Sequence, residues 1–467
     1  MRVITWIVLT GIGFSVLYSC AEKTSAASES KIRIEPGFSY AITADINDEK
    51  DPFRYPGINF NLGESYANSK DLQIKVSSSN PEVVPPSNLI LSGTGNSRNL
   101  RLRAAIPGYT TITLKVSNGI SEMSYRLDYA ASLSPDDRSR RWHAGSPDAS
   151  AAIAIDDHLM IVANDESNLL YLYDRRISGP AITTFDINTA NVLGLTDSSM
   201  GQWKEVDIEG GVRGIADPSI TYWIGSMSNN SAFLYKPNRN KIFAMQVLGN
   251  GKSIELKNRG SYTRLREHLI KWGDRYGYNF TASAATGKDC KSNDGFNIEG
   301  LVFGPDNKTA FIGFRAPLVP VGTRSKAVIA PIKNFEAWFN NGTPAKDPQF
   351  DAPIELDLGG RGIRDIIRLS GGNYLVVAGS SGWELNPAAY TWSGKRNDVP
   401  VPVTGFDLTG LNVEGVLPVS DSANFKNRVQ VFTDNGAEFF YCDTLCVKDL
   451  LEERFKKFCS VVLPVDK

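Results

Sequence analysis

Acidic residues recur at matching places along the last two thirds of the chain. Each lies in a short apolar run followed by a turn, as in DIEGG, NIEGL and NVEGV. The five residues are Asp156 (or its neighbour Asp157), Glu209, Glu299, Asp365 and Glu414. Carboxylates gathered in one place repel each other unless a cation neutralises them, and a cage of oxygen ligands suits Ca²⁺ or Mg²⁺. We therefore expect a divalent cation, with calcium as the first candidate. The alternative is that each acid accepts backbone N–H groups in its own turn.

Basic residues recur beside these acids. They are Arg213, Lys236, Arg239, Arg315 and Arg364. A guanidinium group is the usual partner of phosphate or carboxylate oxygens, so the set predicts an anion-binding site. A neighbouring metal ion would add a Lewis acid or activate a water molecule. In that scheme Glu299 and Asp365 bind the ion or activate the water molecule, while Arg315 and Arg364 bind the anion. Ion pairing between these bases and the acids is the alternative.

Several other chemistries are poorly supported by the residues present. The chain has three histidines, which disfavours a multi-histidine metal centre, and it lacks the G-x-S-x-G, P-loop and H-E-x-x-H motifs. Fifty basic residues balance fifty-one acidic ones, giving a formal charge of −1. This balance argues against a nucleic-acid partner, because such binders carry a basic surface. An anionic small molecule or a glycan remains the expected ligand.

The elements that must position the acids are strands. The acids recur at intervals of about 50 to 90 residues with many strand-like runs between them, which is typical of β-propeller blades. We predict an all-β chain with a propeller of about five blades, six being possible, over residues 149–467. The pattern of residues 261–276 predicts an inserted helix, because Leu265, Leu269 and Trp272 share one face. Residues 447–457 predict a second helix.

The region before the propeller has a different pattern. Residues 31–131 alternate between apolar and polar positions in short runs separated by Ser, Asn, Pro and Gly, which predicts a β-sandwich. The segment 76–119 resembles bacterial Ig-like and cadherin-like repeats, and this resemblance implies a spacer or adhesive module. Residues 132–148 form the predicted linker. Acids between Asp45 and Asp51 could bind calcium, although a solvated loop is the favoured interpretation.

The first thirty residues set the expected compartment. Residues 1–19 read as a secretory signal, and the sequence LYSC resembles the lipobox in which Cys20 is acylated. Residues 20–30 have the composition of a flexible tether. We therefore expect a lipid anchor on Cys20 and a place in the bacterial cell envelope, periplasmic or at the cell surface, with the outer membrane favoured. Such a compartment favours two disulfides among the other four cysteines, Cys290, Cys442, Cys446 and Cys459, with a Cys446–Cys459 bridge plausible.

Several stretches between Asp148 and Gly436 resemble a bacterial family of secreted propellers classed as a domain of unknown function. They include DASAAIAIDD, ANDESNLLYLYDR, NIEGLVFGPD, FIGFRAPL and LDLGGRGIRDI. A more remote likeness to esterase-like phytase propellers implies a metal-assisted phosphoester hydrolase. The leading hypothesis is therefore a metal-dependent hydrolase of a phosphoester or related ester. The alternative is a non-catalytic scaffold that binds glycan or protein, with tryptophans as platforms: Trp203, Trp223, Trp383 and Trp392.

Overall fold

The structure is a computed structural model of the chain. It describes residues 33–34, 41–135, 139–339, 346–382, 384–420 and 428–465. The predicted signal segment, the tether, Cys20 and Trp383 lie outside these residues. The described part is mostly β-structure arranged in many sheets, with few helical segments. No helix of this part is long and apolar enough to cross a membrane.

Two four-stranded sheets at the start of the chain pack face to face. Their strand orders are β1-β3-β6-β5 and β2-β8-β7-β4. The inward residues of β7 and β8 alternate with exposed ones, which is the period of a strand with one buried face, and they join Phe53 and Phe60 in a shared core. The strands are Arg33–Ile34 (β1), Ala41–Asp45 (β2), Ile58–Asn61 (β3), Gln73–Ser78 (β4), Leu89–Ser92 (β5), Ser97–Leu102 (β6), Gly108–Ser117 (β7) and Glu122–Ser132 (β8). The short helix α1, Glu64–Ala67, follows β3.

Five further sheets follow one another along the chain, and they are antiparallel apart from the short strand β13. The first two are β10-β11-β12-β14 and β17-β18-β19-β20, and the next two are β21-β22-β23-β24 and β25-β26-β27-β28. Their strands are Ala151–Ala154 (β10), Leu159–Ala163 (β11), Leu169–Asp174 (β12), Thr183–Asp186 (β14), Ile208–Arg213 (β17), Ile220–Gly225 (β18), Ile242–Leu248 (β19), Glu255–Tyr262 (β20), Asn297–Phe303 (β21), Ala310–Ala316 (β22), Ala327–Ile332 (β23), Ile354–Leu356 (β24), Gly362–Arg368 (β25), Tyr374–Gly379 (β26), Ala388–Trp392 (β27) and Val401–Pro402 (β28). A separate pair, Ser198–Ser199 (β15) and Gln202–Trp203 (β16), lies between the first two sheets in the sequence.

The fifth sheet joins the two ends of this region. Its order is β13-β9-β31-β30-β29, with Arg140–Ala144 (β9), Gly179–Pro180 (β13), Val413–Val419 (β29), Arg428–Thr433 (β30) and Lys457–Pro464 (β31). The late strand β31 pairs with β30 on one side and with the early strand β9 on the other. Residues more than 300 positions apart in the sequence thus share one sheet.

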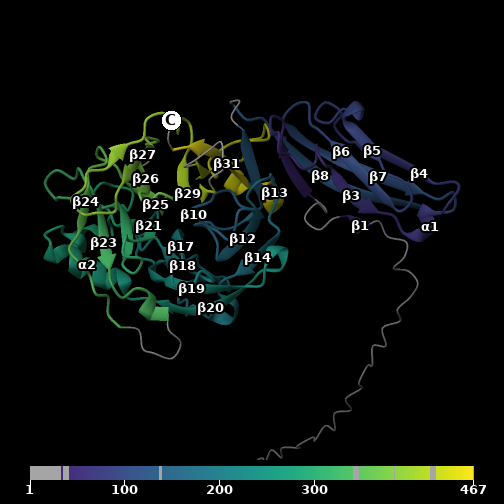
Figure 1. Cartoon of the computed structure of the whole chain (residues 1–467). Coiled ribbons are helices and arrows are strands. Elements are labelled where there is room, and N and C mark those ends of the chain that lie inside the picture. Colours follow the sequence, from purple (N-terminus) through teal and green to yellow (C-terminus); the bar gives the residue numbers. More distant parts are fainter. Residues whose placement is uncertain are drawn as a thin grey trace, which may run out of the picture.

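The five sheets are arranged in a ring, which we call the sheet ring. The first strand of each sheet contacts the first strand of the next, in the order β10, β17, β21, β25, β29 and back to β10. Figure 1 shows these five strands together at the centre of the ring. A hydrophobic cluster fills the space between each pair of neighbouring sheets, so five clusters complete the circle. Because both faces of most sheets are covered, strands such as β21 and β22 are buried throughout.

One of the two predicted helices is present. Helix α2, Leu265–Arg275, buries Leu265, Leu269 and Trp272, the three residues whose spacing predicted it. It starts at Leu265 rather than residue 261, because the preceding residues belong to β20. The short helix α3, Phe280–Ser283, packs against it. The helix predicted for residues 447–457 is wrong: this segment forms two single 3₁₀ turns, and Lys457 already belongs to β31.

The disulfide prediction is also wrong. No disulfide joins the four described cysteines. Cys459 is buried in β31, where its sulfur lies 3.1 Å from Arg140 Nη1 and 3.1 Å from Thr433 Oγ1. Cys446 instead lies at the start of a turn and donates to Asp449 Oδ2. The predicted Cys446–Cys459 bridge is therefore replaced by separate polar contacts.

A buried lysine links the N-terminal pair of sheets to the sheet ring. Lys457 begins β31, is fully buried, and donates to Ala44 O at 2.7 Å and to Ser132 Oγ at 2.9 Å. Its ammonium group also lies over the ring of Trp142 at 4.8 Å. Asp45, Asp48 and Asp51 are buried close by, and their charges oppose the effect of burial on the pKa of Lys457, which falls to about 8. The favoured interpretation of this acidic loop as solvated is therefore wrong, because Asp45, Asp48 and Asp51 are buried near an ammonium group.

Candidate metal centre

The acids of the ring centre sit on β-bulges. In each of three inner strands, one residue near the start has no partner on the neighbouring strand. This residue is Glu209 in β17, Glu299 in β21 and Glu414 in β29. A bulge re-aims the side chain of its extra residue. In β25 the extra residue is Arg364 rather than Asp365. The innermost strands therefore present three glutamates and one arginine from the same structural position.

Close packing requires glycine after two of the three bulged glutamates, Glu209 and Glu299, whereas Gly415 has room for a side chain. A side chain on Gly210 would place Cβ 2.9 Å from Ile224 Cγ2 and 3.1 Å from Glu299 O. On Gly300 it would lie 3.1 Å from Gly313 Cα. Glycine allows neighbouring inner strands to approach, which brings the bulged side chains together. The Glu-Gly pairs of the sequence are thus one structural unit.

A cavity of about 590 Å³ lies at the N-terminal ends of the inner strands. Its wall is formed by the bulged glutamates and by the loops that follow the second strands of the sheets. These loops contribute Asp165 after β11, Asp434 after β30, and the Ser228–Asn229 pair after β18. The acidic residues of the wall are Asp148, Asp165, Glu166, Glu205, Asp207, Glu209, Asp289, Glu299, Glu414 and Asp434.

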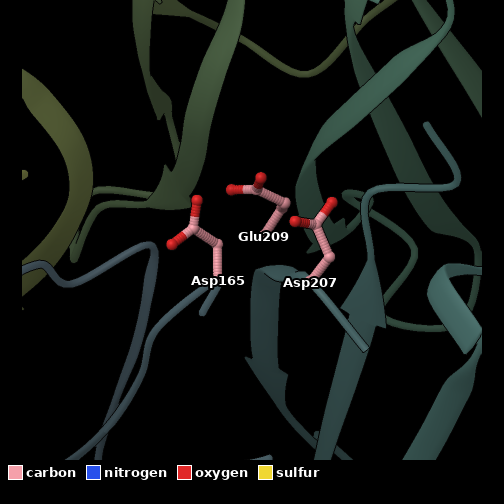
Figure 2. A group of neighbouring side chains, drawn as sticks. All are labelled: Asp165, Asp207 and Glu209. Atoms are coloured by element: carbon pink, nitrogen blue, oxygen red, sulfur yellow. The ribbon is translucent and has the colours of Figure 1, made fainter. Parts of the chain in front are cut away.

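Two groups of three carboxylates meet inside the cavity. Oxygen atoms of Asp165, Asp207 and Glu209 all lie within 4.8 Å of one another, and so do oxygen atoms of Glu209, Glu299 and Glu414. Figure 2 shows the first group, with the Glu209 carboxylate between those of Asp165 and Asp207 in this view. Glu209 belongs to both groups. The spacing of each group fits a Ca²⁺ ion, whose oxygen ligands lie at about 2.3–2.6 Å and hence up to about 5 Å apart.

Arginines neutralise part of this charge. Arg364 donates from Nη1 to Glu299 Oε2 at 3.1 Å and from Nη2 to Glu414 Oε1 at 2.7 Å. Arg315 Nη1 lies 2.9 Å from Glu299 Oε1, and Arg239 Nη1 lies 3.0 Å from Asp207 Oδ2. The three predicted anion-binding arginines at the site are therefore already paired with carboxylates. This arrangement matches the ion-pairing alternative of the sequence interpretation.

The acids differ in how well their charge is compensated. Burial raises the pKa of Glu299, but Arg364 and Arg315 outweigh burial and lower it overall. Burial raises the pKa of Glu414 to about 7 despite the opposing effect of Arg364. For Glu209, burial raises the pKa well above its ordinary value, and the charges of Glu299 and Asp207 raise it further. Burial and the charge of Asp207 act in the same way on the pKa of Asp165.

Several buried oxygen atoms on the cavity wall have no hydrogen-bond partner among the described residues. They are Asp148 Oδ1, Asn229 Oδ1 and Asn297 Oδ1, on side chains of residues that are 5%, 3% and 4% exposed. The amide nitrogen of Asn229 donates to Ala285 O and Lys288 O, and that of Asn297 donates to Glu299 Oε1. The two amide oxygens are therefore left over as acceptors. Carboxylate and amide oxygens together are the ligand set of a hard divalent cation.

Two acids predicted for this site lie elsewhere. Asp156 is in the exposed turn after β10, where Oδ1 accepts from the backbone of His158 and Leu159. Asp365 accepts from the backbone N–H groups of Ile366 and Val416, and burial raises its pKa to about 7. It lines a second cavity of about 340 Å³ at the C-terminal ends of the inner strands. The bulge shifts the register by one residue, so Arg364 occupies the place that alignment gave to Asp365.

Two predicted bases also lie outside the acidic cavity. Arg213 donates from Nη1 to Ile155 O at 2.6 Å and lines the second cavity. Lys236 pairs with Asp197 at 3.1 Å. Two of the candidate tryptophans, Trp223 and Trp392, are buried in the clusters between sheets, whereas Trp203 is exposed on β16.

Sequence reasoning missed several residues of the centre. Asp207 and Asn297 lie two residues before the bulged glutamates, and Asn412 has the same place before Glu414, so a [DN]-x-E-G signature repeats three times. Asn412 donates to Asp434 Oδ2 at 3.0 Å. This signature could have indicated the wider site. Asp148, Asp165 and Asp434 lie in loops without a shared motif and carried no comparable signal.

Residues 249–400 match the family described as protein of unknown function (DUF3616). The matched DUF3616 segment runs from the end of β19 to the residue before β28, and includes Glu299, Arg315 and Arg364. No curated protein matches the chain.

Among solved structures the chain is similar to several bacterial proteins at low identity. A DUF4623 family protein from Bacteroides eggerthii has 9% identity and a TM-score of 0.29, with 81% of this chain and 86% of that chain covered. A quinonprotein alcohol dehydrogenase-like protein from Bacteroides thetaiotaomicron has 10% identity, coverage of 91% and 83%, and a TM-score of 0.24. A protein of unknown function from Dyadobacter fermentans has 11% identity, coverage of 85% and 99%, and a TM-score of 0.28. Similarity at this level carries no argument about activity.

Proposed function

We propose that the chain is a lipid-anchored envelope protein whose sheet ring is a five-bladed β-propeller, preceded by an Ig-like sandwich. Its axial cavity holds a divalent cation, calcium being the first candidate, and the protein is a metal-dependent hydrolase of a phosphoester or related anionic ester. The lipid is attached to Cys20. The sandwich limits are those drawn from the sequence, residues 31–131. The propeller includes β9, Arg140–Ala144, and therefore begins inside the predicted linker 132–148 rather than at residue 149.

One observation carries the cation proposal: Glu209 has carboxylate oxygens of four other acids within 4.8 Å and forms no ion pair among the described residues. All the main influences on its pKa raise it, although three arginines stand near the neighbouring acids. Three buried side chains on the same wall keep an unpartnered oxygen. A bound cation would offset the repulsion among the carboxylates and would also coordinate the unpartnered oxygens.

The residues have distinct roles in this proposal. Glu209, Glu299 and Glu414 hold the ion, and Asn297 supplies an amide oxygen beside them. Arg364 and Arg315 fix the orientation of Glu299 and Glu414 through the paired contacts described above. Lys291 and Lys448 on the cavity wall provide positive charge toward which an anionic substrate is drawn. A bound divalent ion would polarise the ester and make a water molecule more acidic.

The proposal is tested by hydrolysis assays on the full chain. Model phosphomonoester, phosphodiester and carboxyl-ester substrates are offered with calcium and with EDTA. We expect turnover that EDTA abolishes, and we expect Glu209→Gln to lower it by about 100-fold. Glu255→Gln is the matched control, because Glu255 is exposed on β20 and does not line the cavity.

The outcomes separate the two functional hypotheses. Turnover that survives EDTA and Glu209→Gln would contradict a metal-dependent hydrolase at this site. Cation binding without turnover of any ester class would instead favour the non-catalytic binding scaffold. Thermal melting adds an independent reading: calcium at about 100 times its dissociation constant should stabilise the chain by about 2.7 kcal/mol.

A further inference from the structure

We propose that the cavity binds two divalent cations bridged by the carboxylate of Glu209. This inference rests on the proposed function for the existence of a cation site and adds a second ion to it. The first ion lies among Glu209, Glu299 and Glu414. The second lies among Asp165, Asp207 and Glu209. Glu209 is the residue common to both groups of close oxygen atoms.

Each group has its own additional oxygen atom. Asn297 lies beside the first group, because its amide nitrogen donates to Glu299 Oε1 at 3.2 Å and leaves Oδ1 unpartnered. Asp148 lies toward the second group, because Ser146 Oγ donates to Asp148 O and accepts from Asn164, the residue before Asp165. Asp148 Oδ1 is buried without a partner, on a residue that is 5% exposed. Two separate unpartnered oxygens therefore point to two separate ligand sets.

The charge on the cavity wall also calls for two ions. Ten acidic and four basic residues line the cavity, and Arg364 adds one more positive charge through its pairs with Glu299 and Glu414. When all are ionised, the formal charge of this set is −5. One divalent cation leaves −3, whereas two leave −1. Crowded like charges repel one another without counter-ions, so two ions compensate the charge of this wall more fully than one.

Among the described residues, neither Asp165 nor Glu209 forms an ion pair. Arg364 and Arg315 donate to Glu299, Arg364 also donates to Glu414, and Arg239 pairs with Asp207. A carboxylate has two oxygens and can give one to each ion. Two ions held in this way would lie about 3.5–4 Å apart, the spacing at which a pair of metals can act on one phosphoester group.

The stoichiometry of binding tests the proposal. Calcium binding to the full chain is measured by calorimetry and by metal analysis after removal of free ions. We expect two ions per chain, and one ion per chain in Asp165→Asn and in Glu414→Gln, with the loss falling on a different site in each. Glu255→Gln is the control that retains two. Circular dichroism and melting confirm that each variant is folded.

A second measurement uses the unaltered protein. Manganese is substituted for calcium, and electron paramagnetic resonance is recorded at two equivalents per chain. Bridged ions are expected to give an exchange-coupled spectrum that disappears in Asp165→Asn. One ion per chain, or two ions with uncoupled spectra, would overturn the bridged pair while leaving the proposed single-ion site intact. No bound ion at all would overturn both.

Discussion

The carboxylates at the ring centre have pKa values shifted in opposite directions, depending on their nearest neighbours. Glu299 is held ionised by two arginines, whereas Glu209 and Asp165 are driven toward the protonated form by burial and by neighbouring carboxylates. At the proposed cation site, metal binding would therefore release protons that the metal-free centre holds. This exchange makes the stability of the protein depend on pH in a predictable direction.

Stability of the metal-free protein should fall as the pH rises from about 5 to about 8. Folding raises the pKa of Glu414 from 4.5 to about 7, so the folded state binds more protons than the unfolded state over this interval. Glu414 alone then contributes a loss on the order of 3 kcal/mol. Saturating calcium should cancel the part that comes from the cavity. Urea unfolding at several pH values, with EDTA or calcium, measures both effects.

Part of this pH dependence should persist with calcium. Burial also raises the pKa of Asp365 to about 7 and that of Asp48 to about 6, and both lie outside the cavity. A metal-free stability that stays level or rises over the same interval would contradict the assignment of raised pKa values to the central acids.

How far the site could be read from the sequence depends on the residue. Glu209, Glu299 and Glu414 were identified because the Glu-Gly pair repeats. Asp365 was assigned in place of Arg364 because a β-bulge, which adds one residue to a strand, cannot be recognised by aligning the sequence segments. Asp148 and Asp165 were missed because only the folded chain brings these loops to the axis.

At the scale of a single strand, the bulge and the following glycine set the geometry of the centre. Glu299 can turn into the cavity because β21 carries one extra residue, and β21 can lie close to β22 and β25 because Gly300 has no side chain. Small displacements of an inner strand would separate the two ligand groups. Binding and stability should thus be coupled through this strand.

Gly300→Ala is expected to lower the free energy of unfolding by about 1–3 kcal/mol, since the new methyl group would lie 3.1 Å from Gly313 Cα and from Ile363 Cγ2. Gly371→Ala is the matched control, because a side chain there meets nothing within 4 Å. The two variants are compared by urea unfolding and by calcium titration. Equal stability of both would show that the strands are less closely packed than described.

The sequence predicted a helix correctly where apolar residues are spaced so that they lie on one helix face. Helix α2 has Leu265, Leu269 and Trp272 on one side, and all three are buried. Residues 447–457 have a helical composition, yet Val447 and Leu450 are buried from one 3₁₀ turn. Lys457 belongs to a strand and donates to Ala44 and Ser132 of the N-terminal sheets. Tertiary contacts overrode local preference there.

For the whole molecule, Lys457 is the residue that joins the N-terminal sheets to the sheet ring. Its ammonium group donates across the boundary to Ala44 and Ser132 and lies against aromatic rings of the other side. The predicted division of the chain at residues 132–148 gave no hint of this link. Patterns of hydropathy locate units along a chain but do not report contacts between residues some 400 positions apart.

Lys457→Met should lower the free energy of unfolding by about 3 kcal/mol, because two buried hydrogen bonds from a charged donor are lost. Proteolysis between the N-terminal sheets and the ring should also become faster. Lys456→Met is the neighbouring control, since Lys456 pairs with a Glu453 side chain that is 67% exposed and is worth under about 1 kcal/mol. Equal effects of the two variants would refute the role of Lys457 as a link.

The pairing of β31 with β9 has a consequence for biogenesis. The strand that completes the circle follows every other strand in order of synthesis, while its partner is made more than 300 residues earlier. A nascent polypeptide must therefore keep the edge of β9 that faces β31 unpaired until β31 has been synthesised. Early sheets can collapse locally, but the ring closes only after β31 has emerged.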